Sequence, residues 1–140
     1  MRRAELPESI VCGICGYVDA SALLAPGSLV PILERMLARL KHRGPDDRGT
    51  WTEPQRGVAL GQTRLSILDL SQNGHQPMES ACGRYVITYN GEIYNFPALR
   101  AELEAKGARF RGTSDTEVLL AAVTTWGLTE ALRRSVGMFA

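Results

Sequence analysis

The sequence predicts an α+β domain, because helical and strand-like patterns alternate along its 140 residues. Residues 84–89 are dense in β-branched and aromatic side chains, which favours a strand. Ser114-Asp115-Thr116-Glu117 has the spacing of a capping box ahead of an apolar run, which predicts a helix. An earlier helix over residues 28–41 is indicated by apolar residues that repeat on one helix face, namely Leu29, Ile32, Leu33, Met36, Leu37 and Leu40.

The first half of the chain contains two more strand-like segments and two loops. Residues 12–19 are typical of a strand and its exit, and residues 57–67 alternate loosely in the manner of a strand. Ser28 is expected to cap the first helix with its side chain. The segments 42–47 and 70–80 are polar, contain Gly and Pro, and are predicted to be loops.

In the second half, Asn90-Gly91 is expected to form a tight turn, because a predicted strand comes before it and a helix after it. That helix opens at Asn95 and closes at Gly107, and Gly127 ends the helix that follows Ser114. The remaining segments are predicted to be a short strand over 108–111, a short turn over 129–134 and a strand over 136–140.

Composition excludes several classes of function. A formal net charge of +1 gives no electrostatic basis for capture of nucleic acid or of an anionic membrane. The basic start Met1-Arg2-Arg3 is followed by no apolar segment, and the three cysteines fit a cytoplasmic protein with free thiols. With 44% hydrophobic residues, the chain is long enough for the core of one domain.

Cys12-Gly13-Ile14-Cys15 has C-x-x-C spacing, which fits a redox dithiol, half of a zinc site, or two unrelated thiols. A redox dithiol opens a helix, whereas this motif runs into a predicted strand. A structural zinc site needs four ligands, and the other candidates stand singly at His42, His75 and Cys82. We expect Cys15 and Cys82 to be buried apolar residues.

Five short segments, each weak by itself, occur together in a recognisable order. They are Cys12-Gly13-Ile14, His42-Arg43-Gly44-Pro45-Asp46, Arg64-Leu65-Ser66-Ile67, Asn90-Gly91-Glu92-Ile93-Tyr94-Asn95 and Ser114-Asp115-Thr116-Glu117. From Cys12 to the last residue, the chain resembles the glutaminase domain of glutamine-hydrolysing asparagine synthetases. The second and fourth segments resemble the asparagine-type versions rather than those of the related amidophosphoribosyl and glucosamine-phosphate enzymes.

The resemblance implies a four-layer αββα sandwich of two antiparallel sheets, the fold of N-terminal nucleophile hydrolases, here incomplete at its C-terminus. It implies that Cys12 is the nucleophile and that Asn90 and Gly91 stabilise the oxyanion. Arg64 would grip the α-carboxylate of the substrate and Asp115 its α-ammonium. The other substrate-binding residues that it implies are Leu65, Ser66, Ile67, Leu68 and Glu92.

The implied substrate is L-glutamine, and its hydrolysis needs no metal or organic cofactor. ATP and Mg²⁺ are implied only for a synthetase domain, the partner unit in the full-length enzyme, where the ammonia would convert an aspartyl-adenylate into asparagine. The Ser-Gly-Gly-x-Asp-Ser phosphate loop of that unit does not occur in these 140 residues. In agreement with the net charge of +1, we expect no nucleic-acid or membrane partner, and the prediction admits a homodimer.

Residues 1–11 pose a mechanistic question, because the resemblance implies a nucleophilic cysteine at the first position with its own α-amine as base. An α-amine has a pKa near ~8 and a cysteine thiol near ~8.5, so the two exchange a proton at neutral pH. A peptide nitrogen at Cys12 lacks that basicity. Residues 1–11 are therefore a leader or removed propeptide, a misassigned start, or the mark of an inactive protein. We favour a start assigned too early, because a valine codon at Val11 can initiate translation; the domain would then span 12–140.

Two other functions stay open on the sequence. An inactive, truncated amidotransferase relative would act as a non-enzymatic interaction module. A Cys12/Cys15 redox protein would show a reversible dithiol couple that Cys15→Ser abolishes, whereas a glutaminase would keep its activity in that variant.

Overall fold

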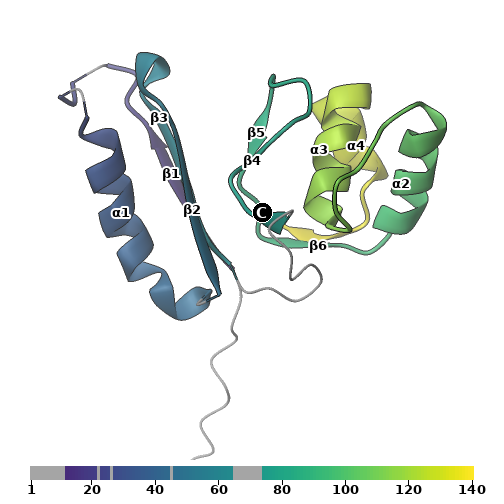
Figure 1. The fold of residues 1–140 in the computed structure, drawn as a ribbon, viewed down its shortest axis with the longest axis horizontal. Coiled ribbons are helices and arrows are strands. Elements are labelled where there is room, and N and C mark those ends of the chain that lie inside the picture. Colours follow the sequence, from purple (N-terminus) through teal and green to yellow (C-terminus); the bar gives the residue numbers. More distant parts are fainter. Residues whose placement is uncertain (1–11, 22, 26, 45, 65–73) are drawn as a thin grey trace, which may run out of the picture.

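A computed structural model describes residues 12–21, 23–25, 27–44, 46–64 and 74–140, and it has an α+β architecture with antiparallel sheets (Figure 1). The first sheet has the order β1-β3-β2. Its strands are β1 (Gly13–Val18), β2 (Asp47–Glu53) and β3 (Val58–Arg64), all paired antiparallel. Helix α1 (Leu29–Arg39) lies along one face of this sheet.

The apolar stripe of α1 packs on that sheet, as its periodicity predicts. Leu29, Leu33 and Leu37 are buried and form a cluster with Ala59 of β3. The start of the helix differs from the prediction, because the Ser28 hydroxyl makes no capping bond and instead donates to the carbonyl of Ala25 at 2.7 Å. The helical pattern ends in a short 3₁₀ turn over Lys41–Arg43.

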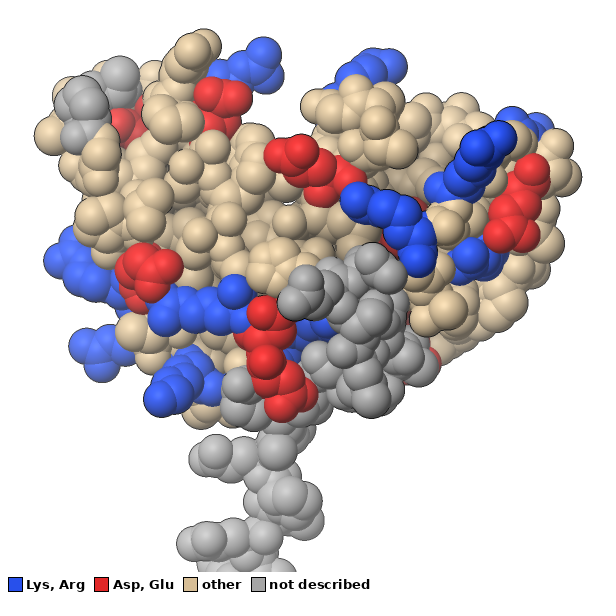
Figure 2. All heavy atoms as spheres, in the orientation of Figure 1, with Lys and Arg blue, Asp and Glu red and all other residues tan. Residues whose placement is uncertain are grey.

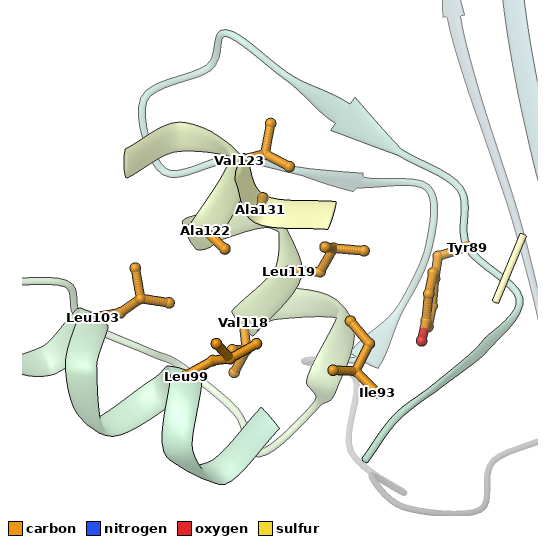
Figure 3. Close-up of a cluster of buried hydrophobic side chains, with 9 residues drawn as sticks. All are labelled: Tyr89, Ile93, Leu99, Leu103, Val118, Leu119, Ala122, Val123 and Ala131. Carbon is orange, nitrogen blue, oxygen red and sulfur yellow. The ribbon is translucent and has the colours of Figure 1, made fainter. Parts of the chain in front are cut away.

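The second half of the chain builds two small antiparallel strand pairs and three helices. The pairs are β4 (Met78–Glu79) with β5 (Val86–Ile87), and β6 (Gly91–Ile93) with β7 (Gly137–Phe139). The helices are α2 (Phe96–Ala105), α3 (Asp115–Trp126) and α4 (Leu128–Arg134). They share a second core, shown in Figure 3, made of Tyr89, Ile93, Leu99, Leu103, Val118, Leu119, Ala122, Val123 and Ala131.

The helix that follows Ser114 is confirmed, but only one of the two hydrogen bonds of its predicted capping box is present. Ser114 accepts a hydrogen bond from the Glu117 backbone N–H at 3.2 Å, which is half of a capping box. The Glu117 carboxylate does not return to Ser114. Its two oxygens accept from the backbone N–H groups of Arg111 and Gly112, each at 2.9 Å. The carboxylate therefore anchors the loop that leads into α3.

The predicted strand over 84–89 is mostly wrong, since only Val86–Ile87 pair as β5. The backbone beyond it is engaged by side chains, because the Tyr89 N–H donates to Gln76 Oε1 and the Tyr89 carbonyl accepts from Gln62. Hydrogen bonds from these two glutamines therefore take the place of the strand-to-strand hydrogen bonds that the local sequence favours.

Three other predictions are corrected. The segment 108–111 is not a strand, and residues 129–134 lie in helix α4 rather than a short turn. Strand β2 was not predicted at all, because its sequence is polar and contains Gly49. Residues 65–67 of the predicted strand and 70–73 of the predicted loop lie outside the described residues.

Asn90-Gly91 does not form the expected tight turn. Gly91 begins β6, and Asn90 exchanges both backbone hydrogen bonds with Ala140, at 2.9 and 2.8 Å. The turn prediction failed because the partner strand is about 45 residues away along the chain, which no local pattern reveals.

The described residues contain no helix with the length and apolar character needed to cross a membrane. On the face drawn in Figure 2, basic and acidic side chains are interspersed. This distribution agrees with the net charge of +1.

Candidate active site

Cys12 and Arg64 are brought to the same face of the first sheet. Gly13 pairs with Thr63 in the antiparallel register of β1 and β3, so one further step places Cys12 opposite Arg64. Directly opposed residues of antiparallel strands point to the same side of a sheet. Thr63 points the other way, because its hydroxyl donates to the Leu40 carbonyl at the end of α1. Cys12 and Arg64 therefore share the face that α1 does not cover.

Cys15 of β1 points to the opposite face from Cys12, because Cys12 directly precedes this strand and lies three positions, an odd number, before Cys15. It packs, half-buried, against the α1 cluster, as predicted. Burial raises the pKa of the Cys15 thiol, and the nearby Arg48 charge partly offsets that effect. This geometry argues against a Cys12/Cys15 dithiol.

The prediction for Cys82 is wrong. This residue is exposed in the turn between β4 and β5 rather than buried in a strand. Its sulfur lies 3.4 Å from the Ser80 hydroxyl, and this hydrogen bond lowers the pKa of the thiol. No group of three or more potential metal ligands occurs among the residues described.

The segment His42-Arg43-Gly44-Pro45-Asp46 supports both Cys12 and Arg64. The Arg43 Nε donates to the Cys12 carbonyl at 3.3 Å, and the Asp46 N–H donates to the Arg64 carbonyl at 3.0 Å. Gly44 is buried against β3, where a Cβ would come within 2.6 Å of the Arg64 backbone. A glycine is therefore required for the loop to lie this close to the strand.

Arg64 is only 9% exposed at the end of β3. Its guanidinium lies against Gly74, where an added Cβ would be 2.2 Å from one terminal nitrogen. The arginine predicted to grip the substrate is thus held in a confined position. The predicted neighbours Leu65, Ser66, Ile67 and Leu68 lie outside the described residues.

Strand β6 directs two backbone N–H groups toward its unpaired edge. Residues 90, 92 and 94 face hydrogen-bonded partners in the register with β7 and its flanks, so Gly91 and Ile93 turn their N–H groups away from β7. Gly91 and Glu92 are exposed, and Asn90 is half-buried. Strand alternation places the Asn90 side chain on the face opposite to that of Tyr89 and Ile93, which belong to the core.

Gly91→Ala is expected to destabilise the fold by about 2–3 kcal/mol. Gly91 has φ +155°, and a Cβ would lie 2.3 Å from the Met138 carbonyl oxygen and 2.4 Å from the Phe139 Cα. Because these are backbone atoms of β7, the strand pair must separate to admit the methyl group. Urea unfolding measures the loss.

Gly107→Ala is the matched control, because Gly107 has φ +93° but nothing within 4 Å of an added Cβ. It tests the backbone conformation without the clash and is expected to cost about 1 kcal/mol. Equal losses in the two variants would show that the approach of β7 to Gly91 is not as close as described.

Asp115 lies at the same edge of β6. Its Oδ2 accepts from the Ile93 N–H at 2.9 Å and from the Tyr89 hydroxyl at 3.1 Å, and the residue is only 6% exposed. It occupies the first turn of α3, where the helix dipole favours a negative charge. The Ile93 N–H, the Tyr89 hydroxyl and the N-terminus of α3 together stabilise the buried Asp115 carboxylate close to Gly91.

Three residues of this region were missed by the sequence interpretation, namely Gln62, Gln76 and Tyr89. Gln62 and Gln76 are 1% and 5% exposed, and each hydrogen-bonds to the backbone of Tyr89. Glutamines are mostly surface residues, so their burial signals a structural or functional role. No local pattern in the sequence distinguishes them from loop or strand glutamines.

A separate open cavity of about 380 Å³ contains none of the predicted site residues. Its lining is His75, Pro77, Met78, Glu79, Ser80, Ala81 and Arg111. His75 Nδ1 lies 2.7 Å from Asp47 Oδ2, within hydrogen-bond distance, and Glu79 accepts a hydrogen bond from Trp51 at 2.9 Å. We assign no role to this cavity.

The comparison of the sequence with known families shows that the chain belongs to the glutamine amidotransferase domain family. The family model "Glutamine amidotransferase domain" matches residues 11–140, which is nearly the whole chain. The match begins next to Cys12 and includes all five segments that carried the resemblance. It supports the amidotransferase interpretation and does not favour the non-enzymatic alternative.

Similar proteins are named after glutamine-dependent enzymes. Asparagine synthetase [glutamine-hydrolyzing] 3 of Bacillus subtilis is 43% identical over 120 residues, covering 83% of this chain and 18% of the relative. A putative asparagine synthetase [glutamine-hydrolyzing] of Mycobacterium tuberculosis is 40% identical, covering 93% and 21%. A glutamine–fructose-6-phosphate aminotransferase of Symbiobacterium thermophilum is 33% identical, covering 90% and 24%. The chain thus spans about a fifth of the length of the synthetases that it matches.

Proposed function

We propose that this domain hydrolyses glutamine to glutamate and ammonia, with Cys12 as the nucleophile. The observation that carries the proposal is the placement of Cys12 opposite Arg64 on the sheet face that α1 leaves uncovered. A thiol on the same sheet face as a confined guanidinium suits attack on a substrate whose carboxylate the guanidinium binds. The family match agrees with this chemistry.

The reaction begins when the α-amine of Cys12 takes the thiol proton. The thiolate attacks the side-chain amide carbon of glutamine, and the amide oxygen becomes an oxyanion. The Asn90 side-chain amide and the Gly91 N–H donate to this oxygen, each such donor contributing about 3 kcal/mol to transition-state stabilisation. The Cys12 α-ammonium gives its proton to the amide nitrogen, the C–N bond breaks to release ammonia and leave a thioester, and water then hydrolyses the thioester to glutamate.

The two ends of the substrate are held by opposite charges. Arg64 binds the α-carboxylate and Asp115 the α-ammonium. The Ile93 N–H donates to Asp115, and the Gly91 N–H lies two residues before it on the same edge of β6. Two residues of a strand span about 7 Å. This spacing suits a glutamine whose ammonium lies at Asp115 and whose amide oxygen lies at Gly91. Leu65 to Leu68 and Glu92 complete the proposed binding site.

We propose that the fold is the αββα sandwich of N-terminal nucleophile hydrolases. The packing of helices on strands supports this proposal. Helix α1 covers one face of the first sheet, and in the second half α3 packs against Ile93 of β6. Gln62 of β3 donates a hydrogen bond to the Tyr89 carbonyl at 2.7 Å, and this bond joins the two halves of the chain on the sheet face that α1 does not cover. The catalytic domain would begin at Cys12, and residues 1–11 would be absent from the mature protein.

The acceptor of the ammonia is proposed from the relatives. Two of the named relatives are glutamine-hydrolysing asparagine synthetases, so the domain would supply ammonia to a synthetase unit that converts aspartate into asparagine. ATP and Mg²⁺ would act in that unit. The steps assigned to this domain use the chain's own residues and no cofactor, and the protein would work in the cytoplasm.

The proposal is tested with two forms of the chain, one beginning at Cys12 and one retaining residues 1–11. The first is expected to release glutamate and ammonia from glutamine. The second is expected to be at least about 100-fold slower, because a peptide nitrogen cannot accept the thiol proton. Mass spectrometry verifies each N-terminus, and released glutamate measures the rate. Equal rates, or no hydrolysis by a folded chain beginning at Cys12, would contradict the proposal.

A further inference from the structure

Tyr89 is fixed by side chains from two other segments of the chain. Its backbone N–H donates to Gln76 Oε1 at 2.7 Å, and its carbonyl accepts from Gln62 Nε2 at 2.7 Å. Gln76 is in turn held by the Thr116 hydroxyl at 3.2 Å, in the first turn of α3. All four residues are at least 95% buried. Because these hydrogen bonds are buried, they hold the Tyr89 backbone rigidly in one position.

The tyrosine ring extends from this anchored backbone toward the carboxylate assigned to the substrate ammonium. The ring is 4% exposed in the second core, beside Ile93 (Figure 3). Its hydroxyl donates to Asp115 Oδ2 at 3.1 Å, the oxygen that also accepts the Ile93 N–H. Within the described part of the chain, no hydrogen bond is directed at Asp115 Oδ1.

The phenol remains a hydrogen-bond donor throughout the working pH range. Burial raises the pKa of Tyr89 far above its usual value, and the neighbouring Asp115 charge and hydrogen bond raise it further. Ionisation would place a second negative charge against a buried carboxylate, which is strongly unfavourable. Asp115 therefore always faces a neutral O–H group.

We propose that Tyr89 is a positioning residue for the recognition of the substrate's α-ammonium. By holding Asp115 Oδ2, together with the Ile93 N–H, it fixes the carboxylate so that Oδ1 faces the ammonium. Gln62 and Gln76 fix Tyr89, and Thr116 ties this network to the helix that carries Asp115. The inference rests on the proposed function, since it takes Asp115 as the ammonium-binding group.

The test measures binding rather than turnover, in the 140-residue chain with Cys12→Ala. Isothermal titration gives the dissociation constants of glutamine and of glutaramate, which is glutamine without its α-amino group. Tyr89→Phe keeps the ring and removes only the donor. It is expected to weaken glutamine binding about tenfold and to leave glutaramate binding within about twofold, because hydrogen bonds to charged groups are the stronger kind.

Tyr17→Phe is the matched control, because the Tyr17 hydroxyl also donates one hydrogen bond, to the Leu29 carbonyl at 2.9 Å, on the face covered by α1. It is expected to change neither dissociation constant. In an Asp115→Asn background, Tyr89→Phe is expected to have no further effect on glutamine binding, because the two residues act as one unit.

Three outcomes would overturn the inference: equal weakening of both ligands by Tyr89→Phe, no weakening of either, or absence of glutamine binding by the parent chain. The hydrolysis assay with Cys12 at the N-terminus is independent of all three. Failure of hydrolysis with an intact glutamine-to-glutaramate difference would reject the proposed function and retain the role of Tyr89 in recognition. Hydrolysis without that difference would reject the role of Tyr89 alone.

Discussion

Cys12→Ala is expected to reduce glutamine hydrolysis by at least about 1,000-fold in a chain that begins at residue 12, because no other group replaces the attacking sulfur. The substitution removes one heavy atom from the residue directly before β1, whose register begins at Gly13. The stability of the fold should therefore change little. Released glutamate measures the rate, and thermal unfolding reports the stability.

Cys15→Ser is the control for this experiment, because Cys15 lies in β1, three positions after Cys12, but faces α1. It is expected to keep glutaminase activity within about twofold and to lose some stability, since a hydroxyl replaces a thiol in an apolar cluster. Retained hydrolysis in Cys12→Ala would contradict the proposed mechanism. Loss of activity in Cys15→Ser would instead favour a role for both thiols.

Asp115→Asn is expected to raise the KM for glutamine about 100-fold, equivalent to about 2.7 kcal/mol of binding free energy. The asparagine carbonyl can keep the hydrogen bonds from Ile93 and Tyr89. Its NH₂ group then faces the substrate ammonium, so a donor replaces an acceptor and the negative charge is lost. Steady-state kinetics with glutamine measures the change, and kcat should fall less than KM rises.

Glu117→Gln is the matched control, because Glu117 is another buried carboxylate in the first turn of α3. Its oxygens accept backbone N–H groups from Arg111 and Gly112, so this variant should lose about 1–3 kcal/mol of stability. Its KM for glutamine should stay within about twofold of the parent value. A similar KM increase in both variants would assign the Asp115 effect to loosening of α3 and not to the substrate.

Helices α1, α2 and α3 could be predicted well, whereas α4 was predicted to be a short turn. The stripe of α1, the start of α3 at Ser114 and the end of α2 before Gly107 all matched the structure closely. Each depends on residues no more than about four positions apart, which is the range of helical hydrogen bonds and caps. The exception at Ser28 shows that a suitable capping residue does not always adopt a capping conformation.

Strands and turns were predicted less well, because their partners are distant in sequence. The Asn90-Gly91 segment reads locally as a turn, but β7 pairs with it and makes it a strand. Residues 84–89 have strong strand propensity, yet Gln62 and Gln76 bind the backbone of Tyr89 and end the ladder. In both places a nonlocal hydrogen bond overrides the local preference.

The sequence by itself determined the family, the helices α1, α2 and α3, and the identity of the candidate catalytic and binding residues, because short motifs and local periodicity are encoded by near neighbours. Only the tertiary structure decided that Cys15 faces helix α1 and that Arg64 stands opposite Cys12. It also brought Tyr89 to Asp115. These relations depend on strand register and on side chains that meet across the core, and both are set by contacts between residues far apart in the chain.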